Sequence, residues 1–376
     1  MKTAQKKLLQ WYEKNHRKLP FRITKEPYKI WISEVMLQQT RVNAMLEPYQ
    51  KFIKKFPSIK KLADSTEEEV IRHWHGLGYY SRAINLQKGA VYVRDNHNCV
   101  FPETYREAIK IPGVGPYTAR AILSIAYHKS YAVVDGNVKR VLARYFLFDK
   151  NVSLPTSATI LQEMADNFLN RDNPSEHNQA MMELGATVCT PKPDCKACPV
   201  QSSCLAFQSN KQNDLPIQNK NADKIKINMK FFLLDYKGKV LLIKDNQRRF
   251  FKKIYTLPFL IEGKDLDNSY QNDVRFTDYL NSINYQCYQF SAKHSITNHD
   301  IAVSLCKSSI QNSQISFLNN FDFKWVDFED IRNEFPSSIS DKLKTLMKKY
   351  MEPSNHLEEL PLTKMLALKQ RFSKNK

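Results

Sequence analysis

Hydrophobic residues recur along the first half of the chain with the spacing of a helix face. Val138, Val141, Leu142 and Tyr145 fall on one side of a helix, and residues 1 to about 207 have a mostly helical pattern. We therefore predict an all-α domain over 1–208. Three basic residues lie off this apolar stripe, where we expect them to meet water or phosphates: Lys139, Arg140 and Arg144.

The pattern changes after residues 209–225, which are rich in Asn, Gln and Lys and are predicted to be a linker. Beyond them, residues 230–236 and 240–244 flank Lys237-Gly238-Lys239, which predicts a β-hairpin. Further strands are predicted at 255–260, 286–290 and 301–306, and a helix at 338–350. These elements predict an α+β domain over 226–350, followed by a short basic tail, 351–376.

The charge balance favours a polyanionic partner. The 376 residues include 57 Lys and Arg against 38 Asp and Glu, a formal net charge of +19. Such an excess favours nucleic acid through release of counterions. An anionic membrane is the rival partner, but no strongly amphipathic basic helix supports it. A basic surface that only keeps the protein soluble is the plainest alternative.

The chain lacks the patterns of membrane and secreted proteins. No stretch approaches the roughly 20 apolar residues of a membrane span. Residues 1–21 mix Lys, Gln, Glu and His and lack the apolar core of a signal peptide. Seven cysteines, four of them clustered, argue against a secreted disulfide scaffold. We expect a cytoplasmic protein.

A glycine-rich turn runs into a helix at residues 111–122, I-P-G-V-G-P-Y-T-A-R-A-I. Gly113 and Gly115 have no Cβ, so the backbone can take positive φ and approach another molecule closely. Amides at the positive end of the following helix are a ready site for a phosphate. The segment V-V-D-G-N-V-K-R follows and brings the carboxylate of Asp135. A phosphate site beside a carboxylate indicates chemistry on nucleic acid.

Four cysteines within sixteen residues indicate a metal centre. Their spacing is C-x5-C-x2-C-x5-C, and their numbers are Cys189, Cys195, Cys198 and Cys204. Four thiolates suit one zinc ion in a tetrahedron or a [4Fe-4S] cluster, and the spacing leaves both open. The other three cysteines are predicted to be ordinary packing residues: Cys99, Cys287 and Cys306.

Several segments resemble the helix-hairpin-helix DNA glycosylases that carry an iron–sulfur cluster, most closely the adenine DNA glycosylase (MutY) branch. They are W-I-S-E-V-M-L-Q-Q-T from Trp31, G-L-G-Y-Y-S-R from Gly76, the hairpin, V-D-G-N and E-L-G-A-T-V-C, which together cover most of residues 20–207. The resemblance implies a six-helix barrel module and a helical module that holds a [4Fe-4S] cluster on the four cysteines. The first cysteine gap is five residues here instead of the family's usual six.

The resemblance gives two carboxylates complementary roles. Glu34 shares a helix face with Ile30 and Leu37, so we expect burial to raise its pKa and keep a proton available. The resemblance makes Glu34 the acid that protonates the flipped adenine at N7. Asp135 matches the carboxylate that stabilises a cationic sugar, although by itself it also suits a helix N-cap. Asn137 matches an asparagine that holds the active-site network.

Other matches concern strand cleavage and DNA contact. Tyr117 stands where bifunctional relatives of the endonuclease III type have a lysine that forms a Schiff base. A phenol cannot, so we predict a monofunctional enzyme with Tyr117 hydrogen-bonded near the sugar or Asp135. By resemblance, Gln39 and Tyr79 enter the base stack around the flipped nucleotide and Arg22 lines the adenine pocket. The same resemblance implies that Thr40, Gly113 and Gly115 also bind DNA.

The second domain resembles, more weakly, the domain that reads 8-oxoguanine and is built like a Nudix hydrolase. Residues 251–258, F-K-K-I-Y-T-L-P, match a family segment in part. Thr297 and Asn298, followed by His299, correspond to the lesion-recognition loop, with Asn298 where a histidine is usual. No segment matches the magnesium-binding Nudix box, so we expect binding without pyrophosphate hydrolysis. A generic stabilising domain is the alternative.

The sequence therefore predicts a monomeric base-excision-repair glycosylase of the bacterial cytoplasm and nucleoid. Its substrate would be adenine opposite 8-oxoguanine or guanine in double-stranded DNA. One rival is a bifunctional endonuclease for oxidised pyrimidines, which Tyr117 and the second domain argue against. Another is a non-catalytic iron–sulfur DNA-binding protein, which the presence of both Glu34 and Asp135 argues against. A nucleotide pyrophosphohydrolase in the second domain is a third.

Overall fold

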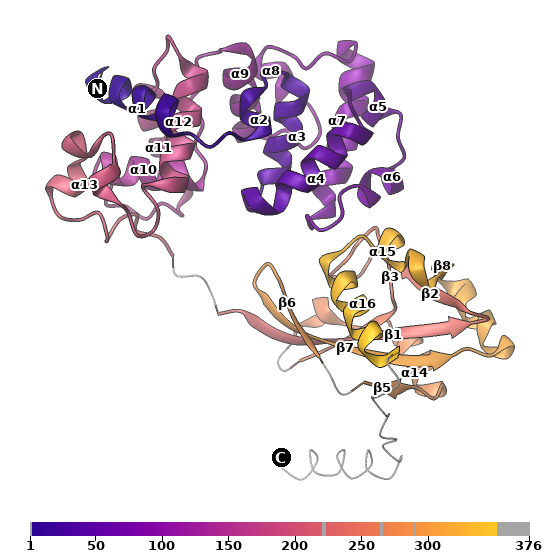
Figure 1. Cartoon of the computed structure of the whole chain (residues 1–376). Coiled ribbons are helices and arrows are strands. Elements are labelled where there is room, and N and C mark those ends of the chain that lie inside the picture. Colours follow the sequence, from indigo (N-terminus) through magenta and orange to yellow (C-terminus); the bar gives the residue numbers. More distant parts are fainter. Residues whose placement is uncertain (1, 220–222, 264–265, 289–290, 352–376) are drawn as a thin grey trace. The chain divides into compact units, whose positions relative to one another are not determined.

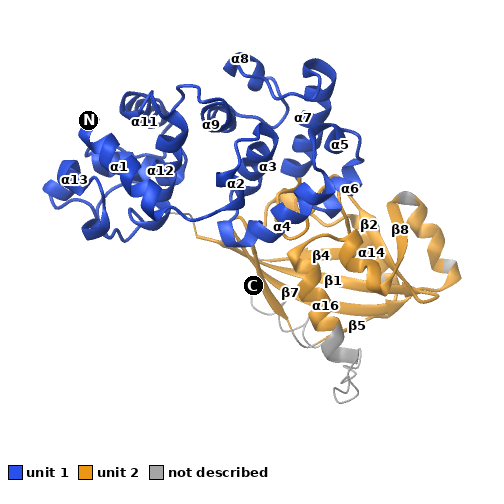
Figure 2. Ribbon diagram, turned by 45° about the horizontal axis from the view of Figure 1, so that its top comes forward, with its two compact units in different colours: residues 1–73, 81–221 blue, residues 74–80, 222–376 orange. Residues whose placement is uncertain are grey.

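The computed structural model describes residues 2–219, 223–263, 266–288 and 291–351. Two compact units divide the chain (Figures 1 and 2). The first comprises Met1–His73 with Ser81–Asn221, and the second comprises Trp74–Tyr80 with Ala222–Lys376. Part of the predicted linker (220–222) and all but the first residue of the predicted tail (352–376) lie outside the described residues.

The first unit is helical, which confirms the predicted all-α fold of this region (Figure 1). Its helices are α1 (Lys2–Asn15), α2 (Pro20–Ile23), α3 (Pro27–Leu37), α4 (Val42–Lys55), α5 (Ile59–Ala63), α6 (Glu67–Arg72), α7 (Tyr80–His97), α8 (Tyr105–Ala108), α9 (Pro116–Tyr127), α10 (Gly136–Tyr145), α11 (Pro155–Phe168), α12 (Pro174–Thr187) and α13 (Leu205–Gln208). In the described part of the chain, no helix combines the length and apolar character needed to cross a bilayer.

Helix α10 buries its predicted apolar stripe, since Val138, Val141, Leu142 and Tyr145 are all under 10% exposed. The prediction that its basic residues face water or phosphates is wrong for Arg144, which is 2% exposed. Its guanidinium donates instead to three backbone carbonyls, those of Leu215, Thr190 and Pro191. The helix packs against α11, α12 and α13, and its other two basic residues, Lys139 and Arg140, are half-buried.

The glycine-rich turn joins α8 to α9, and Pro116 is the first residue of α9 as predicted. Gly113 has φ of +80°, and a Cβ there would lie 2.9 Å from the Cβ of Asn85. Gly115 does not use the left-handed region, because its φ is −88°. Only the first of these two glycines is therefore required by backbone conformation.

In the described residues of the second unit, eight strands form a mixed sheet, as expected for an α+β domain. The strands are β1 (Ile225–Tyr236), β2 (Lys239–Lys244), β3 (Tyr255–Thr256), β4 (Phe259–Glu262), β5 (Gln286–Cys287), β6 (Ala292–Ile296), β7 (His299–Ser309) and β8 (Asp322–Asp327), with helices α14 (Val274–Ser282), α15 (Ile331–Glu334) and α16 (Ser338–Met351). Strand β1 pairs antiparallel with β2 and β4 and parallel with β7.

The predicted hairpin is confirmed: Lys237 and Gly238, with φ of +51° and +80°, form the two-residue turn between β1 and β2. The predicted strand 255–260 is instead two strands, because Pro258 between them has no N–H to donate to a ladder. The predicted strand 286–290 is described only over 286–288, of which β5 comprises 286–287.

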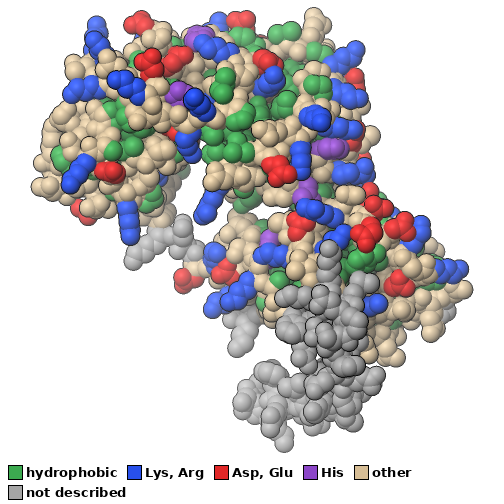
Figure 3. Space-filling view, in the orientation of Figure 1, with side chains coloured by type: hydrophobic (Ala, Val, Ile, Leu, Met, Phe, Trp, Pro, Cys, Tyr) green, Lys and Arg blue, Asp and Glu red, His purple; other side chains and the backbone are tan. Residues whose placement is uncertain are grey.

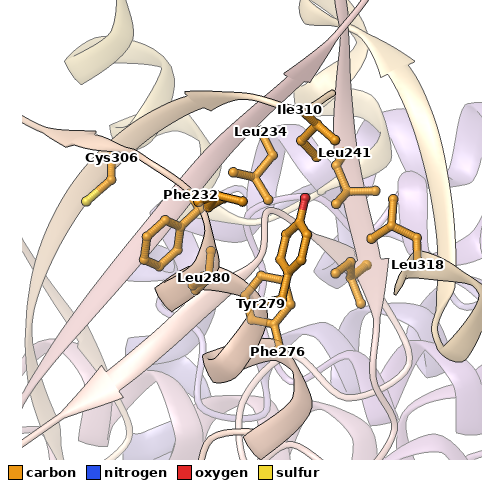
Figure 4. Close-up of a cluster of buried hydrophobic side chains, with 11 residues drawn as sticks. Phe232, Leu234, Leu241, Phe276, Tyr279, Leu280, Cys306, Ile310 and Leu318 are labelled. Atoms are coloured by element: carbon orange, nitrogen blue, oxygen red, sulfur yellow. The ribbon is translucent and has the colours of Figure 1, made fainter. Parts of the chain in front are cut away.

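Aromatic and aliphatic side chains from β1, β2, β7 and α14 fill one core of the second unit (Figure 4). Cys306 is fully buried there and forms a disulfide with the exposed Cys287. The two residues are direct partners in the β5–β7 ladder, with Cα atoms 3.9 Å apart. The prediction that both are ordinary packing residues is therefore wrong.

Candidate active site

One cavity of the first unit, about 1000 Å³ in volume, brings together most of the predicted site residues. It lies where the ends of α2 and α3 meet the starts of α9 and α10 and one face of α12. The predicted residues that line it are Arg22, Glu34, Gln39, Thr40, Tyr117, Asp135 and Asn137. Glu34 and Asp135 therefore open into the same cavity although they lie 101 positions apart in the sequence.

Glu34 is buried at 1% exposure on α3, whose flanking residues Ile30 to Ile32 are buried as well. Both of its carboxylate oxygens have a donor. Arg22 Nη1 lies 3.1 Å from Oε1, and the Tyr117 hydroxyl lies 2.8 Å from Oε2. A buried carboxyl is tolerated when its oxygens are hydrogen-bonded in this way.

Tyr117 keeps its proton, because burial and then the neighbouring charge of Glu34 raise its pKa well above the ordinary value. Its hydroxyl therefore donates, and its partner in this structure is Glu34 and not Asp135. Met182 Sδ lies 3.8 Å from that hydroxyl and 3.7 Å from Arg22 Nη2. Met182 was not predicted from the sequence. Its sulfur is a soft, weak acceptor that contacts both donors of Glu34.

Asp135 both caps α10 and lines the cavity. Its prediction as a helix N-cap and its prediction as an active-site carboxylate are therefore compatible. Its Oδ1 accepts from the Val138 amide at 2.7 Å, and its Oδ2 accepts from Asn137 Nδ2 at 3.3 Å. Burial raises the pKa of Asp135, the Val138 hydrogen bond opposes that effect, and the charge of Glu34 adds to it. The carboxyl thus lies near a second carboxyl in a low-dielectric site.

Asn137 links Asp135 to the segment that begins the cysteine loop. Its Oδ1 accepts from Arg140 Nη2 at 2.8 Å, and Arg140 also donates to the carbonyls of Cys189 and Gly185. Gly185 allows this close contact, because a Cβ there would lie 2.7 Å from the Cβ of Asn137. Helices α10 and α12 therefore meet at a residue without a side chain.

The turn after α3 carries Gln39 and Thr40 at the edge of the cavity. Gln39 has φ of +58°, an unusual conformation for a residue with a side chain. Arg82 holds this turn, since it donates to the carbonyls of Met36 and Gln38 and to Thr40 Oγ1. These are groups at the C-terminal end of a helix that have no partner within it. In the sequence, the only indication of this role for Arg82 is that it ends the segment G-L-G-Y-Y-S-R.

Three other predicted DNA-binding residues do not line the cavity. Tyr79 is 38% exposed and lies on the segment that groups with the second unit. Gly113 and Gly115 are exposed on the turn before α9, where their backbone is accessible to a phosphate.

The predicted lesion-recognition residues have contrasting environments in the second unit. Thr297 and Asn298 are exposed in the turn between β6 and β7, with φ of +52° at Thr297. His299 is 3% exposed, and its Nε2 lies 2.6 Å from the hydroxyl of Tyr270. The side chains of Thr297 and Asn298 therefore face solvent, whereas His299 belongs to the core.

The four clustered cysteines are half-buried thiols. Burial raises the pKa of Cys195, Cys198 and Cys204, that of Cys198 to about 12, and the neighbouring thiols raise each of them further. Arg144 Nη1 lies 3.4 Å from Cys189 Sγ. Among the described residues, no three His, Cys, Asp or Glu side chains are placed to hold a single metal ion. The thiols are therefore close enough to interact electrostatically.

Comparison with known proteins identifies the family of the chain. Residues 32–168 match the family described as HhH-GPD superfamily base excision DNA repair protein. The adenine DNA glycosylase of Buchnera aphidicola subsp. Baizongia pistaciae is 38% identical over 262 residues, 69% of this chain and 74% of that protein. The adenine DNA glycosylase of Buchnera aphidicola subsp. Schizaphis graminum is 31% identical over 312 residues, 82% of this chain and 89% of that protein.

Among solved structures, a thermostable thymine-DNA glycosylase is similar with a TM-score of 0.51 and 27% identity, over 55% of this chain and 96% of that one. Its fold therefore corresponds to part of this chain only. The residues that match the family include Glu34, Tyr117 and Asp135 of the cavity lining. The chain belongs to the adenine DNA glycosylase family, within the HhH-GPD superfamily of base-excision DNA repair proteins.

Proposed function

We propose that the protein is a monomeric DNA glycosylase that hydrolyses the N-glycosidic bond of adenine mispaired with 8-oxoguanine or guanine in double-stranded DNA. The observation that carries the proposal is the shared cavity of Glu34 and Asp135. Its volume of about 1000 Å³ can receive an extruded nucleoside, which base removal from a duplex requires. The relatives named above are adenine DNA glycosylases.

Glu34 and Asp135 have different roles in the proposed reaction. Glu34 delivers a proton to the extruded adenine and makes it a better leaving group, while Arg22 and Tyr117 fix the position of the carboxyl. Asp135 stays ionised and stabilises the positive charge that develops on the sugar. Pairing a proton-holding carboxyl with an ionised one is the usual division of labour in glycosidic cleavage.

We propose that the enzyme is monofunctional, because the hairpin residue Tyr117 has no amine to form an imine with the sugar. Lys139 is the one lysine among the described residues that line the cavity. Borohydride trapping on nicked substrate tests the proposal, with Lys139→Ala as a control for incidental trapping. Efficient trapping that survives Lys139→Ala and accompanies strand cleavage would contradict it.

We propose that the second unit is a Nudix-like domain that reads 8-oxoguanine through the exposed Thr297 and Asn298. The relative from Schizaphis graminum supports this, because its 312 matched residues exceed the length of the first unit and must extend into the second. The mixed sheet is compatible with such a domain. No phosphate release from 8-oxo-dGTP is expected.

We also propose that Cys189, Cys195, Cys198 and Cys204 hold a [4Fe-4S] cluster. Their mutual proximity and half-buried setting support it. The cluster would fix the loop between α12 and α13 as a structural unit. Arg144 would bring positive charge to the ligand Cys189.

The experiment that tests the main proposal is incubation with four duplexes that carry adenine opposite 8-oxoguanine, guanine, cytosine or thymine, followed by alkali. Nicks at the adenine are expected only in the first two. Glu34→Gln should lower the rate by about 100-fold or more, because an amide cannot deliver the proton. Equal nicking of all four duplexes, or full activity of Glu34→Gln at neutral pH, would overturn the proposal.

A further inference from the structure

The extended segment between α9 and α10 carries Asp135 but pairs with no strand. Residues 131–133 instead have their backbone groups bound by side chains on two sides. On one side, Asn178 of α12 accepts from the Val133 amide at 3.0 Å and donates to the Tyr131 carbonyl at 2.8 Å. The bonds alternate along the segment as they would along a strand.

The other side of the segment is held by α11. Asp166 Oδ1 accepts from the Ala132 amide at 3.2 Å, and Gln162 Nε2 donates to the Ala132 carbonyl at 3.1 Å. Arg120 lies 3.1 Å from the same Asp166 oxygen and fixes it. The helices on either side thus replace the two neighbouring strands that an extended segment in a sheet would have.

Asn178 is the buried member of this arrangement. Its exposure is 2%, and of its two partners Val133 is 1% exposed and Tyr131 is half-buried. Loss of the amide would therefore leave the buried N–H of Val133 unsatisfied and would remove the side-chain partner of the Tyr131 carbonyl. The segment would have to move to recover those hydrogen bonds.

Such a movement reaches the cavity at once, because Asp135 is two residues beyond Val133. Asp135 is tied at its other end to α10 through the Val138 amide. A carboxylate that stabilises charge on a sugar must be placed to within a fraction of an ångström. The position of that carboxylate therefore depends on the hydrogen bond at the Val133 amide and on the one at the Val138 amide.

We infer that Asn178 is a positioning residue for base release, which fixes the extended segment that carries Asp135. The inference rests on the glycosylase function proposed above. Asn178 itself touches neither the base nor the sugar in this role. Its contribution is to the rate of base release, with little effect on affinity for DNA.

The test compares Asn178→Ala and Asn178→Asp with the parent under excess enzyme, where the rate constant for base release is separated from DNA affinity. Asn178→Ala loses both hydrogen bonds, and Asn178→Asp keeps an acceptor for the Val133 amide. We expect a loss of about tenfold or more for Asn178→Ala and a smaller loss for Asn178→Asp, since a displaced catalytic group costs of this order. The enzyme concentration at half-saturation should change less than about twofold.

Gln87→Ala is the matched control. Gln87 donates its amide to the carbonyls of Ser65 and Ala63, on a loop of the same unit that does not line the cavity. Its loss should lower the melting temperature and leave the rate constant unchanged. If Asn178→Ala does the same, the inference is overturned while the proposed function stands.

Two further outcomes are decisive. If Asn178→Ala does not fold, the folded Asn178→Asp variant decides by its rate constant, and parental activity in that variant overturns the inference. If the parent itself releases no adenine from any of the four duplexes, the proposed function fails, and the inference fails with it.

Discussion

Glu34 and Asp135 line the same cavity but have different neighbours. Glu34 receives hydrogen bonds from a guanidinium and a phenol, whereas Asp135 receives them from the start of α10 and from Asn137. Different surroundings are what allow two carboxyls in one site to take opposite parts in catalysis. The assignment of Glu34 as acid and Asp135 as charge stabiliser belongs to the proposed function and does not follow from these neighbours alone.

Asp135→Asn should abolish base release without lowering stability. Burial raises the pKa of Asp135 in the folded state, so the carboxylate lowers the free energy of unfolding at pH values above that pKa. The amide keeps an acceptor for the Val138 amide and carries no charge. Near neutral pH the variant should therefore melt at the same temperature as the parent or higher.

The pH dependence of stability checks the direction of this difference between Asp135→Asn and the parent. As pH falls through the raised pKa, the parental carboxyl takes up a proton and the parent gains stability relative to the variant. Melting curves at a series of pH values measure this difference. A large loss of melting temperature for Asp135→Asn at neutral pH would show that the cap outweighs the buried charge.

Sequence motifs singled out Glu34, Asp135 and Tyr117, which line one cavity, because each lies in a short characteristic segment. They did not predict Met182 or Arg82. The importance of these two comes from partners far away in the sequence: Arg82 binds the end of α3, and Met182 contacts donors from α2 and α9. Local patterns carry no information about such contacts.

At the scale of elements, the approach of α10 to α12 depends on Gly185. Gly185→Ala would place a Cβ 2.7 Å from Asn137 Cβ and 2.9 Å from its carbonyl oxygen, so the helices must move apart. Overpacking of this kind costs about 1–3 kcal/mol. For a unit of this size, we expect the melting temperature to fall by about 2–4 °C for each kcal/mol.

Gly115→Ala is the matched control for that prediction. Its φ is ordinary and no atom lies within 4 Å of the added Cβ, so stability should be unchanged. Calorimetry on both variants makes the comparison. Equal melting temperatures for Gly185→Ala and the parent would mean that α10 and α12 separate without cost.

Element types followed from periodicity in the sequence, and the helices of the first unit and the β1–β2 hairpin are confirmed. What failed depended on tertiary context. The direction of Arg144 is set by the cysteine loop, and the pairing of Cys287 with Cys306 is set by strand register. Neither the direction of Arg144 nor the disulfide can be predicted from local hydrophobic spacing.

At the scale of the whole molecule, basic side chains are spread over the visible face of the protein, with acidic side chains among them (Figure 3). The net charge of +19 therefore predicts DNA binding that weakens with salt. A distributed charge supplies affinity without sequence preference, so discrimination has to come from the cavity and the second unit.

Loss of one clustered cysteine should remove the metal centre. Cys198→Ser is expected to lower bound iron from about four per chain toward zero and to reduce the melting temperature, because a cubane needs all its thiolates. Iron and sulfide assays with melting curves measure both effects. Cys99→Ser, which changes a free cysteine outside the cluster, should change neither. Full iron content in Cys198→Ser would contradict the proposed ligand set.

Removal of the second unit should reduce discrimination between 8-oxoguanine and guanine opposite adenine. The truncation should end after Asn219, because the carbonyls of Leu215 and Ile217 are bound by Arg144 and Val152 of the first unit. Base-release rates on the two duplexes give the ratio, which should fall toward one. Retained adenine release opposite guanine shows that the site is intact, and an unchanged ratio would make the second unit a scaffold.

The parallel ladder between β1 and β7 has a consequence for how the chain matures. The ladder pairs Ile225 with His299 at one end and Asp235 with Ser309 at the other. During synthesis, the central strand β1 therefore cannot pair with β7 until residues 299–309 have been added. The helical unit, made almost entirely of earlier residues, can be complete on the ribosome before that partner emerges. Premature termination ahead of β7 would then release a protein with an assembled cavity and an exposed, aggregation-prone sheet edge.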